Sequence, residues 1–439
     1  MKKIEFAGAA LALFASGLLL AGCGYRAPMH KRVIPEADNP AFRIIRPEYR
    51  EMAATIAEST GLLPTQGNQV SIVPVSTDRF QWMLQQLREA RKSIYIDMYR
   101  FRVDSGGVFL YSILEEKARA GLDVRIILDK GANRASDLKK LKQLQDAGAQ
   151  VEFFRFPVWV ADYILPPIAT THRDHRKLMI IDGEIAYIGG RNLADYYYFV
   201  WKDLDACYSG PVVSQLSQVF QENWNRVSPD TPSVSLKPAG SSVREIPPPE
   251  SLPHYSGITI QIIPDSPIDK RLPLRDAFEL AVEQAQDYFY FQSPYLPPPP
   301  STMQKLKEAA LRGVDVRWMV PAKNDIFFQQ WMGETLYKGY LASGIRIFEW
   351  QEGMLHNKMY VSDDYITCIG STNADNLSFF LNYEVSSIIY DAEVAHGTKE
   401  RFLEEQEHCR EIMLKEVEKW NVFRKLRNWL FRIAGGPVG

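Results

Sequence analysis

The sequence predicts an α/β protein built from two duplicated lobes, each a mixed β-sheet flanked by helices. Strand-like and helix-like segments alternate along the chain, which is typical of a sheet with helices packed on its faces. The same order of segments returns in the second half, and a set of polar residues recurs there in constant register. These observations favour two lobes that face each other about a pseudo-two-fold axis and share one site.

Alternating elements fill the first half. Residues 77–90 have a helical pattern, and 93–99 form a strand rich in β-branched and aromatic side chains. An amphipathic helix over 109–120 ends at Gly121, a residue type that favours helix ends. Two further strands are expected at 124–128 and 151–154, with a helix at 135–147 between them.

The second half repeats this pattern after a proline-rich stretch. Residues 232–253 are rich in proline and poor in apolar periodicity, which is typical of a linker. Beyond it, 288–291 resembles the first strand of the first half. Residues 313–317 repeat 121–125, and 344–348 repeat 148–153. The chain therefore contains an internal duplication.

These patterns predict six regions along the chain. The two lobes account for most of it, and the segments outside them are short. The regions are a signal peptide at 1–22, a tether with a first helix at 23–75, a first lobe at 76–231, a linker at 232–256, a second lobe at 257–412 and a basic amphipathic helix at 413–439.

The N-terminus has the layout of a secretory signal. Lys2 and Lys3 precede an apolar run over 6–20, and small residues lead to Cys23. The sequence Leu-Ala-Gly-Cys resembles a bacterial lipobox, which implies cleavage before Cys23 and lipidation of its thiol; an uncleaved anchor helix is the other interpretation. Either interpretation predicts that the folded part of the chain lies in the cell envelope and faces the periplasm, and Gly24 favours the outer membrane over the inner.

Composition narrows the class of partner and cofactor. The formal net charge is −2, whereas proteins that bind nucleic acid usually carry a positive excess, so we expect no nucleic acid partner. No metal-binding motif and no glycine-rich nucleotide loop occurs in the sequence, so we expect neither a metal nor another cofactor. If Cys23 carries lipid, three cysteines remain, and an odd number cannot pair fully.

One constellation of polar residues occurs twice. Each copy has a histidine, a lysine two residues later, an aspartate, a small residue and an asparagine, and then a second acid 28 residues after the histidine. Equivalent residues of the two copies are all 181 positions apart. A shared register over six positions excludes chance as the source of the two copies. The first copy is His175, Lys177, Asp182, Gly190, Asn192 and Asp203, and the second is His356, Lys358, Asp363, Ser371, Asn373 and Glu384.

The spacing suggests how each copy folds. Residues two apart on a strand point to the same face, so His175 and Lys177 are expected side by side on one strand. Asp182 then begins a turn, and a return strand brings Gly190 beside the histidine. Glycine there would let backbone amides approach an anion closely, and Asn192 would add a neutral donor.

This residue set suits phosphodiester chemistry. Two lysines and two asparagines would stabilise the charge on the equatorial oxygens of the transition state. One imidazole can attack phosphorus, while the other protonates the leaving alkoxide and deprotonates the incoming alcohol. Asp203 and Glu384 are candidates for the carboxylates that fix the imidazole tautomers. For Asp182 and Asp363, a structural role in the turn and a chemical role both stay open.

These motifs resemble the phospholipase D superfamily, with its paired His-x-Lys-x4-Asp motifs, over roughly residues 75–410. Within it, segments such as 188–192 and 355–358 are most similar to bacterial cardiolipin synthases. The resemblance implies a metal-free phosphohistidine mechanism, with His175 as nucleophile and His356 as acid and base. It also implies phosphatidylglycerol as a substrate, converted to cardiolipin and glycerol, and one chain is sufficient for the site. A hydrolytic phospholipase D, a secreted nuclease and an inactive scaffold are the alternatives.

Two segments outside the motifs are candidates for membrane contact. Residues 155–171 form an aromatic and apolar insert that has no counterpart in the second half. Near the C-terminus, 422–433 places apolar residues at helical spacing with arginines and a lysine between them, a pattern of helices that lie on anionic lipid. For both segments, packing against the protein's own core is the competing interpretation.

Overall fold

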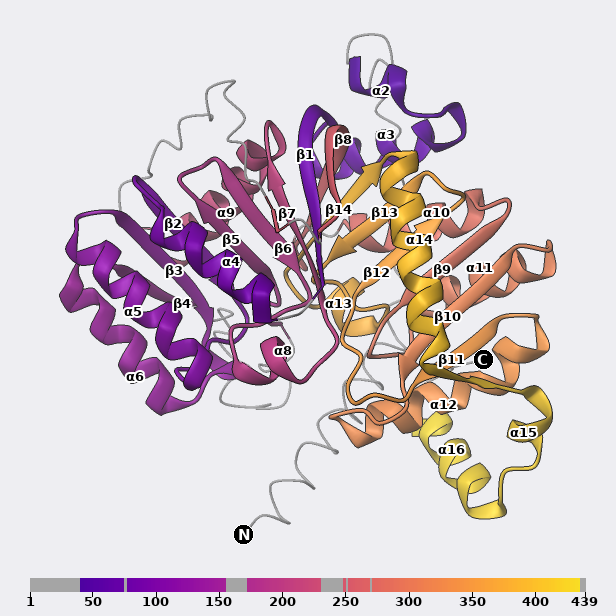
Figure 1. Cartoon of the computed structure of the whole chain (residues 1–439). Coiled ribbons are helices and arrows are strands. Elements are labelled where there is room, and N and C mark those ends of the chain that lie inside the picture. The colour runs from indigo at the N-terminus through magenta and orange to yellow at the C-terminus, as the bar shows by residue number, and fades with distance from the viewer. Residues whose placement is uncertain are drawn as a thin grey trace.

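A computed structural model gives the arrangement of most of the chain (Figure 1). The predicted signal peptide, Cys23 and the apolar insert lie outside the residues that it describes. Within the described ranges, no helix combines the length and apolarity that a bilayer crossing needs. The structure describes residues 40–74, 77–154, 172–229, 248–249, 252–268 and 271–434.

The first lobe consists of a parallel group and an antiparallel group of strands. β2 (Ser93–Met98), β3 (Asp123–Asp129) and β4 (Gln150–Phe154) are parallel, and the helices that join them are α5 (Ser105–Arg119) and α6 (Ala135–Gln143). The remaining elements are α4 (Thr77–Arg88), β5 (Lys177–Ile181), β6 (Ile185–Gly189), α8 (Asp195–Phe199), β7 (Leu204–Ser209) and α9 (Val212–Val227).

The second lobe repeats these elements in the same order, which confirms the predicted duplication. Its parallel strands are β9 (Tyr288–Gln292), β10 (Asp315–Pro321) and β11 (Arg346–Trp350). The remaining elements are β8 (His254–Asp265), α10 (Pro273–Gln284), α11 (Pro300–Leu311), α12 (Phe327–Ala342), β12 (Met359–Ser362), β13 (Ile366–Gly370), α13 (Asn376–Phe380), β14 (Glu384–Tyr390), α14 (Ala392–Glu407) and β15 (Cys409–Ile412).

All described strands join in one continuous sheet whose order is symmetric about its centre. The order is β15-β11-β10-β9-β12-β13-β14-β8-β1-β7-β6-β5-β2-β3-β4, where β1 is Thr65–Pro74. β1 pairs antiparallel with β8, and outward from this pair each strand of one lobe has its counterpart in the other. Only β15 has no partner in this symmetry among the described strands. The pseudo-two-fold axis therefore passes between β1 and β8.

The central position of β1 corrects the predicted domain boundaries. Residues 23–75 are predicted to form a tether and a first helix, whereas β1 pairs with both β7 and β8 inside the sheet. β8 likewise begins at His254, within the predicted linker. Its seven-residue pairing with β14 places it in the second lobe.

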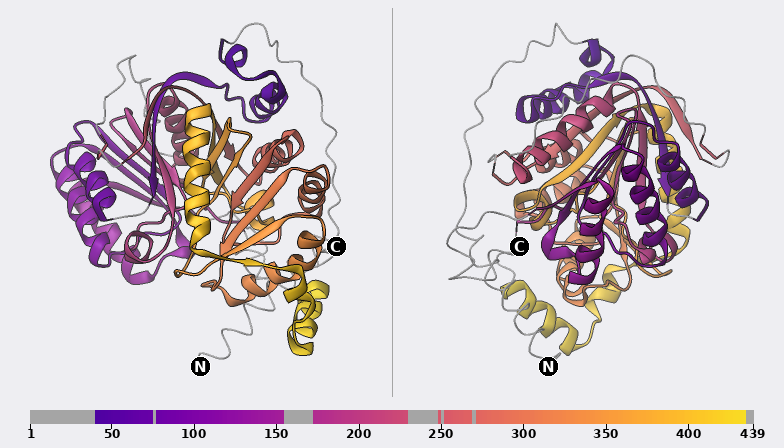
Figure 2. Two further views of the ribbon diagram at one scale, coloured as in Figure 1. Left: turned by 45° about the vertical axis from the view of Figure 1, so that its right-hand side comes forward. Right: turned by 90° about the vertical axis from the view of Figure 1, so that its left-hand side faces the viewer.

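The N-terminal helices also belong to the folded body. α3 (Arg50–Thr60) packs against α10 and β8, and its buried Met52 and Ile56 are part of the apolar cluster of the second lobe. Residues just before the first lobe thus cover the core of the second. Figure 1 shows α2 (Pro40–Ile44) and α3 at one end of the molecule, and both views of Figure 2 agree.

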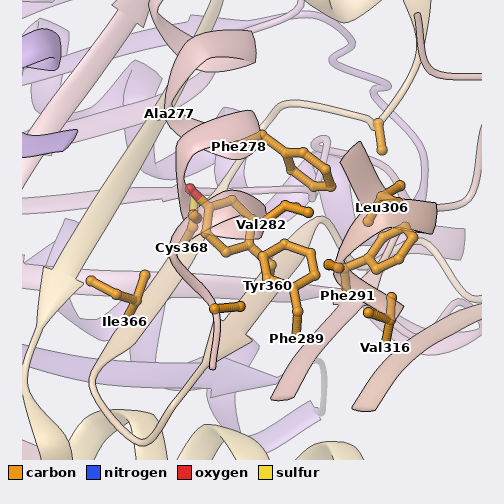
Figure 3. Close-up of a cluster of buried hydrophobic side chains, with 14 of the residues drawn as sticks. Ala277, Phe278, Val282, Phe289, Phe291, Leu306, Val316, Tyr360, Ile366 and Cys368 are labelled. Carbon is orange, nitrogen blue, oxygen red and sulfur yellow. The ribbon is translucent and has the colours of Figure 1, made fainter. Parts of the chain in front are cut away.

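Three apolar clusters hold the structure together. One lies between the first lobe's sheet and α4, α5 and α6, and its counterpart lies between the second lobe's sheet and α3, α10, α11 and α12. Figure 3 shows the aromatic centre of the latter, where Phe278 packs edge-to-face on Phe289 and Tyr360. The third cluster, around α9 and α14, takes buried side chains from both lobes. It fixes the lobes against each other.

The C-terminal region forms two short helices, α15 (Leu414–Glu418) and α16 (Val422–Ala434). α16 packs beside α12, and Arg424 and Arg427 both bind Glu334 of that helix. One face of α16 therefore packs on the second lobe, as one of the two interpretations of this segment predicts. Its other face leaves Val422 and Phe423 exposed.

Candidate active site

Each histidine of the repeated motif lies in an extended segment that crosses to the other lobe. The backbone N–H of His175 donates to the carbonyl oxygen of Tyr383 (2.9 Å), and that of His356 donates to Lys202 (2.6 Å). The spacing predicts His175 on the same strand as Lys177, but β5 begins at Lys177. The residues just before the histidines, Asp174 and Leu355, instead form single parallel bridges to Tyr383 and Lys202, and this brings both motifs to one site.

Both imidazoles bind a carboxylate from the opposite lobe. His175 Nδ1 lies 2.8 Å from Glu384 Oε1, and His356 Nδ1 lies 2.7 Å from Asp203 Oδ2. Both carboxylates are fully buried. Such a partner favours the tautomer with its proton on Nδ1, which leaves Nε2 of each ring for chemistry.

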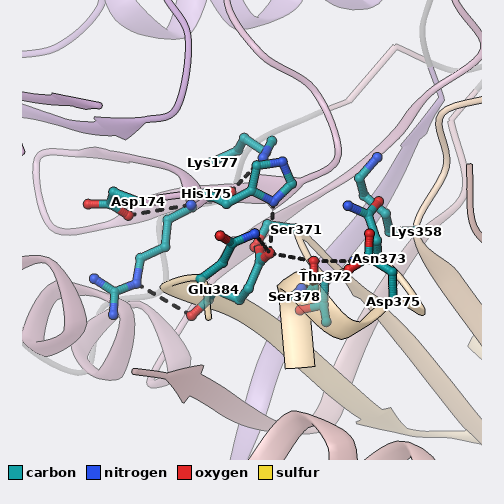
Figure 4. A network of polar contacts seen from close by, with 12 residues as sticks. Asp174, His175, Lys177, Lys358, Ser371, Thr372, Asn373, Asp375, Ser378 and Glu384 are labelled. Carbon is teal, nitrogen blue, oxygen red and sulfur yellow. Dashed lines mark hydrogen bonds and ion pairs between the residues drawn. The ribbon is translucent and has the colours of Figure 1, made fainter. Parts of the chain in front are cut away.

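The two carboxylates are held in different ways, and this explains one difference between the motif copies. Ser371 Oγ (2.5 Å) and Ser378 Oγ (2.7 Å) donate to the two oxygens of Glu384 (Figure 4). Asp203 accepts from the backbone N–H of Leu204 (2.9 Å). At Gly190, the equivalent of Ser371, an added Cβ would lie 2.1 Å from Asp203 Oδ1. Glycine is therefore required where the aspartate approaches the backbone.

This geometry corrects the role predicted for Gly190. Its backbone amide is predicted to approach an anion, but that N–H donates to the carbonyl oxygen of Leu204 (3.1 Å) within the sheet. The N–H of Ser371 likewise donates to Val385 (3.0 Å). Gly190 and Ser371 thus position the carboxylates, and in neither copy does this amide face the site.

The two lysines are buried beside the histidines. Lys177 Nζ donates to the carbonyl oxygen of His175, and Lys358 Nζ donates to that of His356 (2.6 Å). Burial lowers the pKa of Lys177 to about 7, although the charge of Glu384 opposes this shift. Burial also lowers the pKa of Lys358 to about 8. An anion bound between the two ammonium groups would restore their charged forms.

The imidazoles and carboxyls also titrate abnormally. Burial, together with the charges of Lys177 and Lys358, holds the pKa of both histidines well below the usual range. Burial raises the pKa of Glu384 to about 7 and that of Asp203 to about 6. At neutral pH the free site therefore holds neutral imidazoles. A neutral Nε2 is the form that can act as a nucleophile or a general base.

The two asparagines lie beside these groups. Asn192 Oδ1 accepts from the backbone N–H of Arg100 (3.0 Å), which fixes the orientation of its amide. Asn373 is buried next to Lys358 in a small crevice, and its Oδ1 has no hydrogen-bond partner among the described residues. Figure 4 shows Lys358 and Asn373 close together on the side of the site away from Lys177.

Asp182 and Asp363 have structural positions outside the site. Both occupy hairpin turns at positive φ, 58° and 50°. Asp182 accepts the backbone N–H groups of residues 91–93, and Asp363 accepts those of residues 286–288. Each carboxylate thus fixes the start of the neighbouring strand. Of the two roles left open for these aspartates, these contacts support the structural one.

Several aromatic residues around the histidines were not in the predicted constellation. The ring of Tyr99 lies 4.9 Å from that of His175, and the rings of Tyr197 and Trp201 lie 5.2 and 5.1 Å from that of His356. Tyr295 lies 5.9 Å from His356. Trp201 stands two residues before Asp203 in the sequence. This position beside the motif acid is the signal in the sequence that could have identified Trp201 as a site residue.

An ion pair with a buried aspartate supports the segment before His175. Arg173 donates through two nitrogens to Asp129 at the end of β3, with Nε 2.9 Å from Oδ2. The N–H of Asp174 donates to the same carboxylate (3.1 Å).

Within the described ranges, no group of three or more histidine, cysteine and acidic side chains is placed to hold a metal ion.

Comparison with known proteins identifies the family. A family described as "Cardiolipin synthase, PLD-like domain" matches residues 83–224 and 280–405, one segment in each lobe. The chain belongs to this family. Cardiolipin synthase 2 of Staphylococcus epidermidis is 29% identical over 392 residues, which cover 88% of this chain and 78% of that protein. Cardiolipin synthase of Listeria welshimeri is 31% identical, covering 82% and 73%.

Membership of the PLD-like cardiolipin synthase family agrees with the fold. A solved structure, the phosphatidylserine synthase of Haemophilus influenzae, superposes with a TM-score of 0.64 at 13% identity. The match covers 87% of this chain and 96% of that protein. At this identity the likeness concerns the fold alone. The predicted resemblance to the phospholipase D superfamily and the two-lobed α/β class are both confirmed.

Proposed function

We propose that this protein is a phosphatidyltransferase that joins two phosphatidylglycerol molecules into cardiolipin and releases glycerol. The observation that carries the proposal is the crossed pair of histidine–carboxylate contacts, which places two imidazoles and two lysines at one site. The relatives named cardiolipin synthases share this family and match most of the chain. They supply the substrate class that the geometry alone leaves open.

The reaction proceeds by two in-line displacements. His175 Nε2 attacks the phosphorus of the first phosphatidylglycerol, the bond to the glycerol oxygen breaks, and a phosphohistidine forms. His356 gives a proton to the departing glycerol oxygen. The same imidazole then takes the proton from a hydroxyl of the second phosphatidylglycerol. That oxygen attacks the phosphorus, the bond between phosphorus and His175 Nε2 breaks, and cardiolipin leaves the site with His175 neutral again.

The charged groups of the site lower the barrier of both steps. Lys177 and Lys358 carry positive charge to the phosphoryl oxygens, where negative charge grows in the transition state. The bound phosphate also stabilises the protonated form of His356, which the first step needs. Asn192 and Asn373 would add neutral donors. The assignment of nucleophile and acid to the two histidines rests on the family resemblance.

Membrane association completes the proposal. Cys23, lipidated after cleavage of the signal peptide, would tether the enzyme to the periplasmic side of the cell envelope, with Gly24 favouring the outer membrane. The apolar insert at 155–171 and α16 would add contacts with lipid. The exposed apolar face of α16 supports the contact through that helix. Both motifs lie in one chain, so a monomer is sufficient for catalysis.

The decisive experiment is a vesicle assay with protein that lacks residues 1–23. Phosphatidylglycerol is the sole phospholipid, and products are read by mass spectrometry. Cardiolipin and glycerol are expected. Phosphatidic acid alone would make water the acceptor and the enzyme a phospholipase. No product from any phospholipid, with cleavage of DNA, would overturn the lipid substrate.

Two controls accompany the assay. His175→Asn and His356→Asn should each abolish turnover, because one removes the proposed nucleophile and the other the acid and base. A chelator should leave the rate unchanged. Loss of activity in EDTA that added metal restores would contradict the metal-free mechanism.

A further inference from the structure

Among the described residues, most of the exposed large apolar side chains lie at the ends of α5, α8 and α12 and on α16. We propose that this edge, comprising the ends of α5, α8 and α12 and the outer face of α16, is a docking surface for a bilayer that contains anionic phospholipid. The role proposed for this active-site edge rests on the proposed function. It extends that function by identifying the surface of the folded protein that contacts the substrate bilayer.

The first lobe supplies one side of the edge. At the end of α8, Phe199 and Val200 are 50% and 66% exposed, and the next residue, Trp201, packs on His356. In the first turns of α5, Phe109 is 56% exposed. The two helices touch here, because an added Cβ at Gly106 would lie 3.4 Å from the ring of Phe199. Apolar surface thus continues from α5 to the side of the proposed acid and base.

The second lobe forms the other side of the edge, through a series of contacts that also starts at His356. Tyr295 packs edge-on to His356, and its hydroxyl donates to Asp325 (2.8 Å). Two residues later, the exposed Phe327 begins α12 and contacts the ring of Trp331 (4.9 Å). Exposed apolar surface therefore flanks the site on both sides.

α16 extends this surface outward. Arg427 lies over the ring of Trp331 (4.8 Å) and binds Glu334, which fixes the helix beside α12. The helix then presents Phe423, 83% exposed, and Trp429, 56% exposed, to solvent. In Figure 1, α16, α12 and α8 lie at the end of the molecule opposite to α2 and α3. The outer face of α16 therefore belongs to the edge that carries the site.

Charge complementarity selects an anionic bilayer as the occupant. Lys130 and Arg134 are exposed just beyond the carboxyl end of β3, next to the Asp129 that binds Arg173. Lys323 is exposed just after β10, and Lys425 is exposed on α16. Tryptophan and phenylalanine side chains interspersed with lysine and arginine are the composition that binds the interface of anionic membranes.

The test uses two variants of the protein that lacks residues 1–23. One carries Phe423→Glu and Leu426→Glu on α16, and the other carries Val200→Glu. The matched control is Leu311→Glu. Leu311 is 73% exposed at the end of α11, where the chain returns to the opposite edge before β10. Melting temperatures establish that each variant is folded.

Two readouts separate docking from chemistry. The first is flotation with phosphatidylglycerol vesicles together with the transfer rate on them. The second is the transfer rate on a short-chain phosphatidylglycerol below its micelle concentration. Both edge variants should lose on the order of tenfold or more in vesicle binding and vesicle rate, while Leu311→Glu stays near wild type. Rates on the monomeric substrate should change less than about twofold, because the edge does not contact the reacting atoms.

The outcomes distinguish this inference from the proposed function. If the edge variants match Leu311→Glu in vesicle binding and in transfer rate on vesicles, the docking surface is refuted and the proposed activity is unaffected. A wild-type protein that floats with vesicles but makes no product from either lipid would refute the activity, and loss of flotation in the edge variants would still support the surface. A loss of rate on the monomeric substrate equal to the loss on vesicles would assign these side chains to the site and overturn the proposal.

Discussion

At the scale of single residues, each histidine depends on a carboxylate from the other half of the sequence. Asp203 and Glu384 follow the histidine of their own half by 28 residues each. That spacing is equally compatible with pairing inside one lobe and pairing between lobes, so the sequence could supply the acids but not their partners. The crossed arrangement arises from the backbone bridges to Tyr383 and Lys202, which no local pattern records.

Crossed pairing makes different predictions for the two acids. Glu384→Gln keeps the shape of the side chain but no longer selects the Nδ1–H tautomer of His175, so formation of the phosphohistidine should slow by roughly 10²–10⁴-fold. Asp203→Asn should instead slow the steps in which His356 moves protons. Rapid-quench detection of the phosphoenzyme separates the two. A normal rate of phosphoenzyme formation in Glu384→Gln would contradict the pairing with His175.

The lysines predict a pH dependence of anion binding. The site binds a phosphodiester best with both lysines charged, and their pKa values in the empty site are about 7 and about 8. Rising pH neutralises them and also ionises Glu384 and Asp203, so both effects weaken binding. Affinity for a phosphodiester should therefore fall as pH rises from 6 to 9, by about tenfold per pH unit for each lysine that titrates.

Calorimetry with glycerophosphoglycerol measures this dependence, because a phosphodiester keeps its single charge across the range. Lys177→Gln is the matched variant. It should bind more weakly at pH 6 and respond less to pH, since one titrating group is gone. Equal affinity at pH 6 and pH 9 in the wild type would show that the lysines stay charged in the empty site.

At the scale of elements, strands were easier to place than helix starts. The sequence predicts the helix in the first lobe from residue 109, whereas α5 begins at Ser105 with Asp104 as its cap. Gly106 and Gly107 resemble turn residues. They are required inside the helix because an added Cβ at Gly107 would lie 1.8 Å from the carbonyl oxygen of Arg102. Close packing against a preceding loop is a tertiary effect, and a periodicity argument does not detect it.

The hairpin turns test the structural role of the motif aspartates. Asp363→Ala removes a carboxylate that accepts three backbone N–H groups, and it places alanine at positive φ. We expect a loss of stability on the order of 2–3 kcal/mol, with turnover of the folded protein close to wild type. Denaturant titration and an assay at low temperature measure the two quantities. His356→Ala is the contrasting variant, since it should lose activity with little change in stability.

At the scale of the whole molecule, the repeat was predictable and its junction was not. Two copies of one motif indicated two lobes and a shared site, and both follow from the register of 181 residues. The central pair of β1 and β8 was missed because both strands lie beside proline-rich or poorly patterned sequence. The packing of α3 on the second lobe was missed for a related reason. A helix shows from its sequence that it has an apolar face, but not which of two similar cores that face covers.

The packing of the N-terminal elements on the second lobe of the same chain predicts how two inactive variants behave when they are co-expressed. α3 and β1 of one chain lie against α10 and β8 of the same chain, and both crossed histidine–carboxylate pairs close within it. A chain with His175→Ala and a chain with His356→Ala therefore each hold one incomplete site. Co-expression of the two should give no more activity than either alone. If the lobes were exchanged between chains, mixed dimers would contain one complete site, and up to about a quarter of wild-type activity would return. The differently tagged variants, purified together and assayed on phosphatidylglycerol vesicles, distinguish a site within one chain from a site shared between two.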